Sequence, residues 1–152
     1  MKRGDLVALI HVLSWVAVIS IGFAVEPRLP IPRDIARTLG AATFLPGMAL
    51  FFWALAHLKR AFFGNVEPVT DRLVRSGPYR WVRHPIYLAM VIATLGLVLA
   101  LRSPWGLAGV CLLFAPAGAY RARLEDKTLA RKFGRAWEDY AEETAFLLPP
   151  FW

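Results

Sequence analysis

The sequence has little that would stabilise a small secreted domain or form a metal centre. It has one cysteine, Cys111, inside an apolar run, so no disulfide framework can form within the chain, and we expect an ordinary buried apolar residue there. The His, Asp and Glu residues show no spacing typical of metal ligands, and we expect no metal. The absence of an internal repeat, a low-complexity tract or a linker predicts a single domain over residues 1–152.

Charged residues are also scarce. They make up 19% of the chain, against 57% hydrophobic residues and a mean hydropathy of +0.47. This balance excludes an ordinary soluble domain of this length and predicts an all-α, integral membrane protein. The net charge is +7, but the basic residues stand between apolar runs instead of along one face. We therefore expect anionic membrane lipids as partners and no nucleic acid.

Four apolar runs are comparable with the roughly 20 residues that cross a bilayer. They cover residues 6–25, 39–58, 86–101 and 104–120. The first is too long for a signal-peptide core and lacks a cleavage pattern, so we expect it to remain as a span. Pro46 and Gly47 predict a kink in the second. Only Arg102 and Ser103 separate the third run from the fourth, which predicts a tight antiparallel hairpin in a bundle of about four transmembrane helices.

Lys and Arg residues are unequally divided between the two sides of these spans. If the N-terminus is cytoplasmic, 14 of the 18 lie on the inner side, and the outer side holds Arg28, Arg33, Arg37 and Arg102. The positive-inside rule therefore predicts that both termini are cytoplasmic. This topology places residues 73–87 and the C-terminal segment in the same compartment.

Residues 121–143 differ in character from the rest, because they are charged overall and carry an apolar stripe. The spacing predicts a cytoplasmic amphipathic helix whose stripe contains Leu129, Phe133, Trp137 and Tyr140. Continued backwards, the stripe begins with Arg121 and Glu125, which are spaced to pair at i, i+4. We expect Gly134 to weaken this helix and the apolar residues 146–152 to fold back onto the bundle or the interface.

Residues 73–87, with the sequence LVRSGPYRWVRHPIY, combine turn, cationic and aromatic residues at the start of the third apolar run. Gly77-Pro78 predicts a turn, and Pro85 suits the first turn of a helix, which makes His84 its N-cap. The N–H groups of a helix start, with Arg80 and Arg83 nearby, can bind an anionic or polar ligand at the membrane surface.

The aromatic and basic residues of this segment also have a simpler interpretation. A membrane interface commonly collects Arg, Trp and Tyr, so Tyr79, Trp81 and Tyr87 are either stacking surfaces for a ligand or interfacial anchors. By the same argument, His11 in the first span and His57 at the end of the second are expected to be a packed and an interfacial residue. A functional site is favoured because this motif and the acidic start of the C-terminal segment, which contains Glu125, are expected on the same side of the membrane.

Two strings carry a family resemblance. GPYRWVRHPIY (residues 77–87), followed some forty residues later by ED..L...FG..W..Y (residues 125–140), resembles the isoprenylcysteine carboxyl methyltransferase family, to which phospholipid N-methyltransferases are also similar. The resemblance covers about residues 65–152, and the first two spans match only in character. It implies a helical membrane enzyme that binds S-adenosylmethionine between the motif, the last spans and the C-terminal helix.

The resemblance also implies roles for individual residues. Cofactor contacts carry over to Leu73, Val74, Tyr79, His84, Pro85, Ile86, Tyr87 and Glu125, and a substrate contact to Arg121. We add Gly77, Arg83 and Asp126 to the candidate cofactor site, because they belong to the same turn, helix start and acid pair. Arg121 could fix a carboxylate substrate, whereas an amine or thiol would need a proton removed, for which Glu125 or His84 is the candidate.

The implied activity is methylation of a lipophilic or amphipathic acceptor, such as a lipid or a lipidated molecule, at the cytoplasmic membrane interface. Two alternatives stay open. An NADPH-dependent membrane reductase of the sterol-reductase type carries a similar RHP-x-Y segment, although the acids Glu125 and Asp126 favour a sulfonium over a nicotinamide phosphate. A non-catalytic membrane scaffold would bind neither cofactor.

Overall fold

The computed structural model describes residues 3–58 and 73–148. Within these ranges the chain is helical apart from its connections and an isolated β-bridge between Val82 and Ala145. The elements are helices α1 (Arg3–Ala24), α2 (Arg33–Leu58), the 3₁₀ helix η2 (Gly77–Arg80), α3 (Pro85–Ala100), α4 (Pro104–Gly109), the π-helical turn η3 (Val110–Phe114), α5 (Ala115–Phe133) and α6 (Arg135–Glu143). The expectation of an all-α fold is confirmed for the part of the chain that the structure describes.

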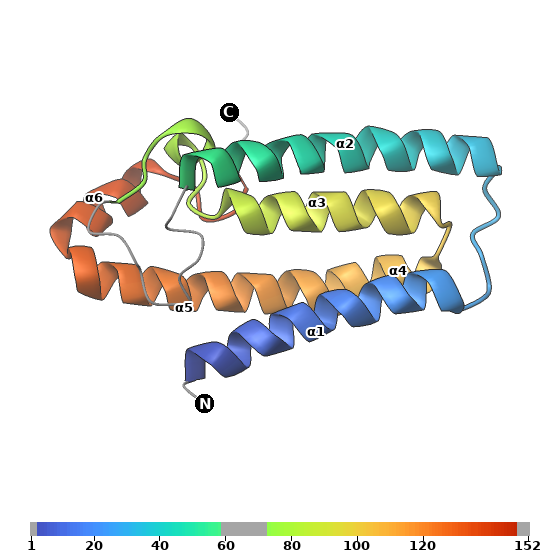
Figure 1. The fold of residues 1–152 in the computed structure, drawn as a ribbon, viewed down its shortest axis with the longest axis horizontal. Coiled ribbons are helices and arrows are strands. Elements are labelled where there is room, and N and C mark those ends of the chain that lie inside the picture. The colour runs from blue at the N-terminus through green and yellow to red at the C-terminus, as the bar shows by residue number, and fades with distance from the viewer. Residues whose placement is uncertain (1–2, 59–72, 149–152) are drawn as a thin grey trace.

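The long helices form an elongated bundle (Figure 1). Helices α2 and α3 lie side by side and antiparallel, while α4, η3 and α5 follow one another along a single line that runs back beside α3. The predicted hairpin is confirmed: three residues link α3 to α4, and the Ser103 hydroxyl caps α4 by accepting a hydrogen bond from Gly106 N at 3.0 Å. Helix α1 crosses α4 and α5. The described chain begins and ends at the end of the bundle that carries η2 and α6.

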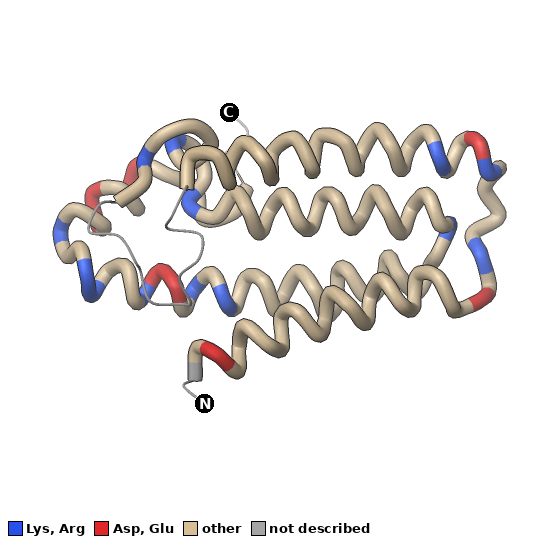
Figure 2. The backbone as a smooth tube through the Cα atoms, viewed as in Figure 1, with Lys and Arg blue, Asp and Glu red and all other residues tan. Residues whose placement is uncertain are grey.

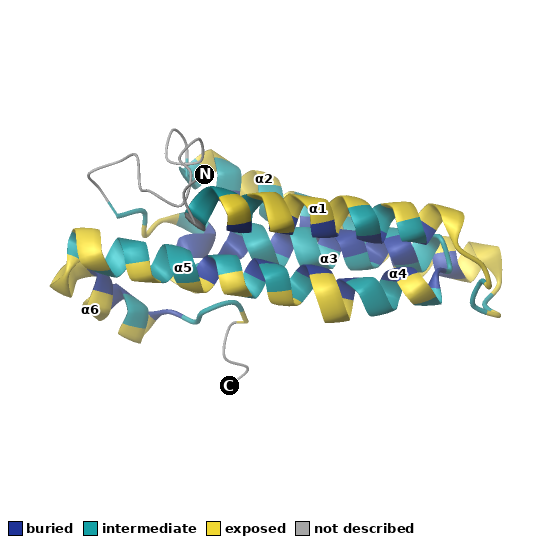
Figure 3. Ribbon diagram, turned by 90° about the horizontal axis from the view of Figure 1, so that it is seen from below, coloured by how far each residue is buried: buried dark blue, intermediate teal, exposed yellow. Residues whose placement is uncertain are grey.

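Many large apolar side chains are exposed on the outside of the bundle, and the buried positions of α2 are small residues. Figure 3 shows the exposed positions along the outer faces of the helices. Leu9 and Leu13 of α1 are about half exposed, while the buried positions of α2 are Ala36, Gly40, Gly47 and Ala54. A soluble domain shows the reverse arrangement, whereas helices that face lipid bring small residues together and leave large ones outside. The bundle is therefore built for a membrane.

Helices α2 and α3 approach each other so closely that their backbones are in contact. A Cβ atom added to Gly47 would lie 2.6 Å from Ala93 N, and one added to Gly96 would lie 2.4 Å from Phe44 N. Gly40 meets Ala100 in the same way. Small residues at these positions are therefore required, because association within lipid depends on van der Waals packing.

Two of the four expected spans meet the length and hydropathy of a membrane-crossing helix, Gly4–Ala24 and Arg33–Leu58. Helix α3 is apolar but has 16 residues, about 24 Å at the rise of an α-helix. The fourth run is divided among α4, η3 and the first turns of α5. The chain is thus a membrane protein with two candidate spanning helices, and a four-span bundle stays a prediction. Pro46 lies inside α2, and the kink there also stays a prediction.

The single amphipathic helix predicted over residues 121–143 is wrong. Helix α5 continues the fourth apolar run through Arg121 to Phe133, and the chain then turns at Gly134 before α6 begins. Gly134 has a φ of +54°, which a residue with a Cβ adopts only with strain. Gly134 ends one helix and starts another, and its effect is larger than the weakening that its helix propensity predicts.

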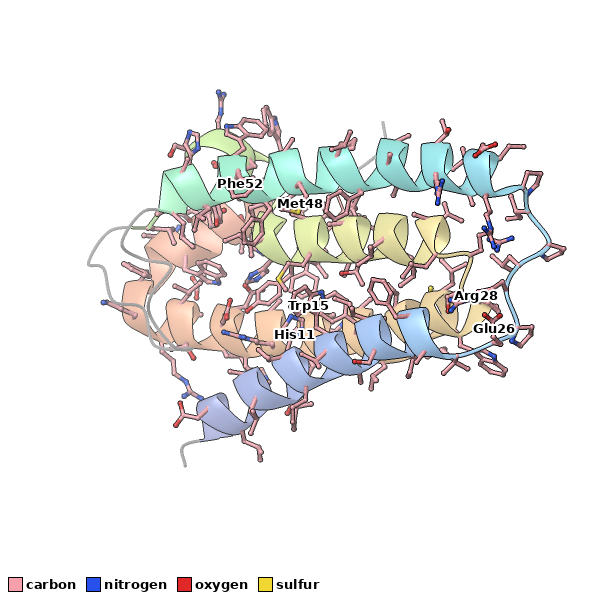
Figure 4. All side chains as sticks on the ribbon, turned by 45° about the vertical axis from the view of Figure 1, so that its right-hand side comes forward. His11, Trp15, Glu26, Arg28, Met48 and Phe52 are labelled. Carbon is pink, nitrogen blue, oxygen red and sulfur yellow. The ribbon has the colours of Figure 1, made fainter. Side chains whose placement is uncertain are left out.

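Charged residues gather at the two ends of the bundle (Figure 2). At the end away from η2, Arg28 donates hydrogen bonds to the carbonyl oxygens of Gly22 and Phe23 and pairs with Glu26 at 2.9 Å (Figure 4). The basic residues of the segment 59–72 lie outside the described residues. Cys111 is exposed, so the expectation that it is buried is wrong, because its part of the helix faces outward.

The contact between α2 and α3 predicts the effect of added bulk. Gly47→Leu forces the two backbones apart and should cost about 1–3 kcal/mol or more, because a packed contact cannot absorb the side chain. Ala49→Leu adds comparable volume on the exposed face of the same helix and should have little effect. Thermal unfolding in detergent measures both variants. Equal midpoints for the two variants would contradict the packing described here.

Candidate active site at the start of helix α3

The turn before α3 depends on a glycine at a crowded position. Gly77 has a φ of +59°, and a Cβ atom there would lie 2.7 Å from the ring of His57 at the end of α2. Gly77 is the first residue of the 3₁₀ helix η2, which contains hydrogen bonds from Tyr79 N to Ser76 O and from Trp81 N to Pro78 O. The turn predicted from Gly77-Pro78 is confirmed.

Helix α3 begins at Pro85 with His84 as its N-cap, as predicted from the sequence. The His84 side chain does not cap its own helix. It is 5% exposed, and its Nε2 atom lies 2.5 Å from the Asp126 carboxylate of α5. The helix start is thereby joined to an acid more than forty residues away in the sequence.

The end of the described chain returns to the same place and pairs with the segment that precedes α3. Arg83 N donates to Ala145 O at 2.8 Å, and Ala145 N donates to Trp81 O at 3.0 Å. The Arg83 guanidinium also donates to the carbonyl oxygens of Ala141 and Thr144. The prediction that the tail folds back is confirmed for Ala145 and Phe146, whereas Leu148 is 64% exposed and residues 149–152 lie outside the described range.

Helix α6 holds this return in place through two buried aromatic residues. Trp137 is 5% exposed and Tyr140 3%, and the Tyr140 hydroxyl donates to Tyr79 O at 2.8 Å. Phe146 then places its ring 5.3 Å from the ring of His84. Of the stripe predicted from the sequence, Trp137 and Tyr140 are buried packing residues, while Leu129 and Phe133 are half-buried on the separate helix α5.

Two acids, Glu125 and Asp126, lie beside His84, and each of them pairs with an arginine. Glu125 accepts a hydrogen bond from the Tyr87 hydroxyl and pairs with Arg121, whose Nε lies 3.3 Å from Oε1. Asp126 pairs with Arg83, whose Nε lies 3.6 Å from Oδ2. The formal charges of the two arginines and the two acids cancel. We call His84, Tyr87 and these four residues the ionic cluster.

Two donors of the ionic cluster are buried without a hydrogen-bond partner among the described residues. They are Nε of Arg83, which lies too far from Asp126 for a hydrogen bond, and Nε of Arg121, which is near Glu125 but makes no hydrogen bond to it. A buried donor without a partner costs free energy, so these atoms are suited to bind a ligand oxygen.

Burial changes the proton affinity of two tyrosines beside the cluster. It raises the pKa of Tyr140 to about 12, although Arg83 and Arg75 oppose the change. Burial also raises the pKa of Tyr79, assisted by Tyr140 and Glu125. Both phenols therefore remain neutral hydrogen-bond donors across the physiological range.

The predicted site residues divide into two groups. The structure brings together Arg83, His84, Tyr87, Arg121, Glu125 and Asp126, with Tyr79 attached through Tyr140. Gly77 and Pro85 shape the turn and the helix start, and the partly buried Leu73, Val74 and Ile86 carry no polar side-chain atom. Trp81 is 54% exposed and lies 5.8 Å from the ring of Trp53, which favours an interfacial anchor.

Sequence reasoning missed two residues beside the cluster. Phe146 lies in the apolar tail that is predicted to fold back, but its ring contact with His84 has no separate signal. His11 is predicted only to pack, yet its ring lies 5.5 Å from that of Tyr87. The sequence feature that could have indicated His11 is its helical spacing from Val7 and Val18, which places the three residues on one face of the first span; the structure buries this face.

The fold and this cluster define a helical membrane protein with a polar site at one end of its bundle. A family model described as phospholipid methyltransferase matches residues 35–136, more than half of the chain. The chain belongs to the phospholipid methyltransferase family, and the resemblance inferred from the motifs is thereby confirmed. The match begins in α2, earlier than the motifs indicated, and ends before Trp137.

One curated relative extends the similarity across most of the chain. The Lamin-B receptor of Drosophila melanogaster is 28% identical over 142 residues, which cover 82% of this chain and 19% of that protein. The chain therefore spans about a fifth of the relative's length.

The hydrogen bond between Tyr140 and Tyr79 gives a test of the tail's docking. Tyr140→Phe leaves the buried carbonyl of Tyr79 without this donor and should cost about 1–3 kcal/mol. The exposed Glu138 on the same helix provides the control Glu138→Ala, which should change little. Thermal unfolding in detergent measures both. An unchanged midpoint for Tyr140→Phe would show that the hydrogen bond does not hold the tail.

The pKa of Tyr140 adds a dependence on pH. The folded state holds this proton up to about pH 12, whereas the unfolded state releases it near 10.0. The resulting stability is complete below pH 10 and decreases as the pH rises towards 12. We expect Tyr140→Phe to lose less stability than the wild type between pH 9 and pH 11, measured as the unfolding midpoint. Equal losses in the two proteins would contradict the raised pKa.

Proposed function

We propose that this protein is an S-adenosylmethionine-dependent methyltransferase that acts on a lipophilic or amphipathic acceptor at the cytoplasmic membrane interface. The observation that carries the proposal is the convergence of Glu125 and Asp126 of α5 on His84 at the start of α3. Family membership supplies the reaction class, and the ionic cluster supplies a polar site of suitable chemistry.

The residues of the cluster fit S-adenosylmethionine. The sulfonium and amino groups of the cofactor favour carboxylates and aromatic faces, which Glu125, Asp126 and Tyr87 provide. Its carboxylate requires hydrogen-bond donors, and Nε of Arg83 and Nε of Arg121, although each lies near an acid, have no hydrogen-bond partner among the described residues. Because the cluster already carries equal numbers of acids and arginines, it has no excess positive charge for the phosphates of NADPH.

When bound, S-adenosylmethionine supplies a methyl group on a positively charged sulfur, and the sulfur keeps the bonding electron pair as the methyl group moves to the acceptor. The protein's task is to align the acceptor with this methyl group and to exclude water. Arg83 and His84 are held by the returning tail, which fixes the helix start. Glu125, oriented by Tyr87 and Arg121, is placed to take the proton that an amine or thiol acceptor releases.

The acceptor is proposed to keep its apolar part in the bilayer while its head group reaches the cluster. The family's description as phospholipid methyltransferases supports a lipid acceptor. The proposed orientation places both termini and the cluster on the cytoplasmic side, since 14 of the 18 basic residues belong there if the N-terminus is inside. A bundle of four spans, with α3 and α4–α5 as the third and fourth, completes this proposal.

Cofactor binding tests the proposal even while the acceptor is unidentified. Calorimetric titration of the purified protein should detect S-adenosylmethionine and should not detect NADPH. Glu125→Ala and His84→Ala should each reduce methyl transfer from labelled S-adenosylmethionine into membrane lipids by a hundredfold or more, on the order of the loss of a preorganised polar group. Both variants should still insert into membranes.

A control variant separates loss of the site from general damage to the protein. Glu142→Ala removes an exposed acid of α6 and should retain wild-type transfer. A wild type that binds NADPH but not S-adenosylmethionine would identify the reductase alternative instead. Binding of neither cofactor would indicate a scaffold, and full activity in Glu125→Ala and His84→Ala would remove the site assignment.

A further inference from the structure

His11 is a buried polar residue to which the proposed function gives no role. It lies on the inner face of α1 with Val7, Ser14 and Val18, and it is 3% exposed (Figure 4). Neither Nδ1 nor Nε2 has a hydrogen-bond partner among the described residues. A buried imidazole without a hydrogen-bond partner destabilises the fold, so packing alone does not explain a histidine at this position.

The structure holds the His11 ring in one place. The ring stacks on Phe114 with centroids 4.9 Å apart, and its Cε1 atom lies where Gly118 has no side chain, since a Cβ there would be 2.9 Å away. A larger residue at position 118 would push the ring out. The position of the imidazole is therefore set by Phe114 of η3 and Gly118 of α5.

His11 lies next to the ionic cluster, on the side of the apolar residue Phe114. Its ring meets the edge of the Tyr87 ring at 5.5 Å, and the hydroxyl of Tyr87 bonds Glu125. One turn further along α1, Trp15 Nε1 donates to Thr94 Oγ1 at 3.0 Å and links α1 to α3 beyond the histidine. Among the described residues, the ring nitrogens of His11 are thus partnerless polar atoms between the cluster and the apolar middle of the bundle.

We propose that His11 binds the head group of the methyl acceptor by accepting a hydrogen bond from its N–H, O–H or S–H. The inference rests on the proposed methyltransferase function and specifies the acceptor class. A neutral imidazole offers one acceptor and one donor, which suits a head group that carries a transferable proton. A carboxylate acceptor has no such proton. Helix α1 lies outside the residues matched by the family model, so this contact would be the chain's own contribution to acceptor choice.

The test compares acceptor kinetics with cofactor affinity in the full-length protein. His11→Phe keeps a ring against Phe114, and His11→Leu is a smaller apolar replacement. Each should raise the KM for the acceptor about tenfold, the change expected for one lost hydrogen bond, while the Kd for S-adenosylmethionine stays the same. His11→Gln should restore part of the loss. The probes are phosphatidylethanolamine vesicles, decanethiol and decanoic acid.

Ser14→Ala is the matched control, because Ser14 is a buried polar residue of the same face whose hydroxyl bonds only the His11 carbonyl among the contacts described. It should leave the acceptor KM unchanged. If the wild type is active and His11→Phe and His11→Leu have the same KM for the acceptor as the wild type, the His11 inference is overturned, while the proposed function stands. The inference is also overturned if His11→Phe and His11→Leu weaken S-adenosylmethionine binding as much as acceptor binding, or if His11→Gln restores none of the loss. Methyl transfer to decanoic acid as the only accepted probe would overturn it too. A wild type that neither binds S-adenosylmethionine nor transfers methyl groups would overturn the proposed function and this inference together.

Discussion

The site depends on one long-range contact, the hydrogen bond at 2.5 Å between His84 at the start of α3 and Asp126 in α5. Without this contact the RHP segment would be only the start of an apolar helix, and the acids would be charges on a separate helix. Several neighbouring contacts help to maintain it. The tail pairs with residues 81–83, Arg83 bonds the carbonyls that end α6, and Tyr140 bonds Tyr79.

The hydrogen bond between His84 and Asp126 requires that α3 and α5 hold fixed positions relative to each other, and the packing of the bundle provides this. Helix α3 is anchored along α2 by glycines and alanines that allow backbone contact, so its first turn has a fixed position. Helix α5 leaves the apolar part of the bundle without a break and carries Arg121, Glu125 and Asp126 to the same level. Gly134 then reverses the chain, and α6 and the tail close over the helix start. The apolar packing and the polar cluster are thus consequences of the same arrangement.

The sequence predicted the parts of the site that local chemistry determines. Pro85 marked the start of α3, Gly77-Pro78 marked the turn, and the i, i+4 spacing marked the pair of Arg121 and Glu125. The family resemblance added which acids belong near His84. These features are local or carried by motifs, so a single sequence was sufficient to find them.

The parts that sequence reasoning missed depend on non-local packing or on backbone angles. The periodic stripe from Arg121 to Tyr140 predicts one helix, because periodicity does not show that Gly134 adopts a positive φ. The apolar run around Cys111 predicts burial, since such a run does not show which face of its helix meets lipid. For His11 the sequence predicts packing alone, and only its position against Tyr87 and Gly118 suggests a further role.

The most direct test of the central claim is a double-mutant cycle on His84 and Asp126 with the Kd for S-adenosylmethionine as the readout. Residues that act as one unit show strong non-additivity, whereas independent residues do not. We predict that His84→Ala and Asp126→Asn each raise the Kd for S-adenosylmethionine. The Kd of the double variant should be little higher than that of the single variant with the larger loss. Losses that multiply in the double variant, or unchanged binding in both single variants, would contradict a site formed by the meeting of α3 and α5.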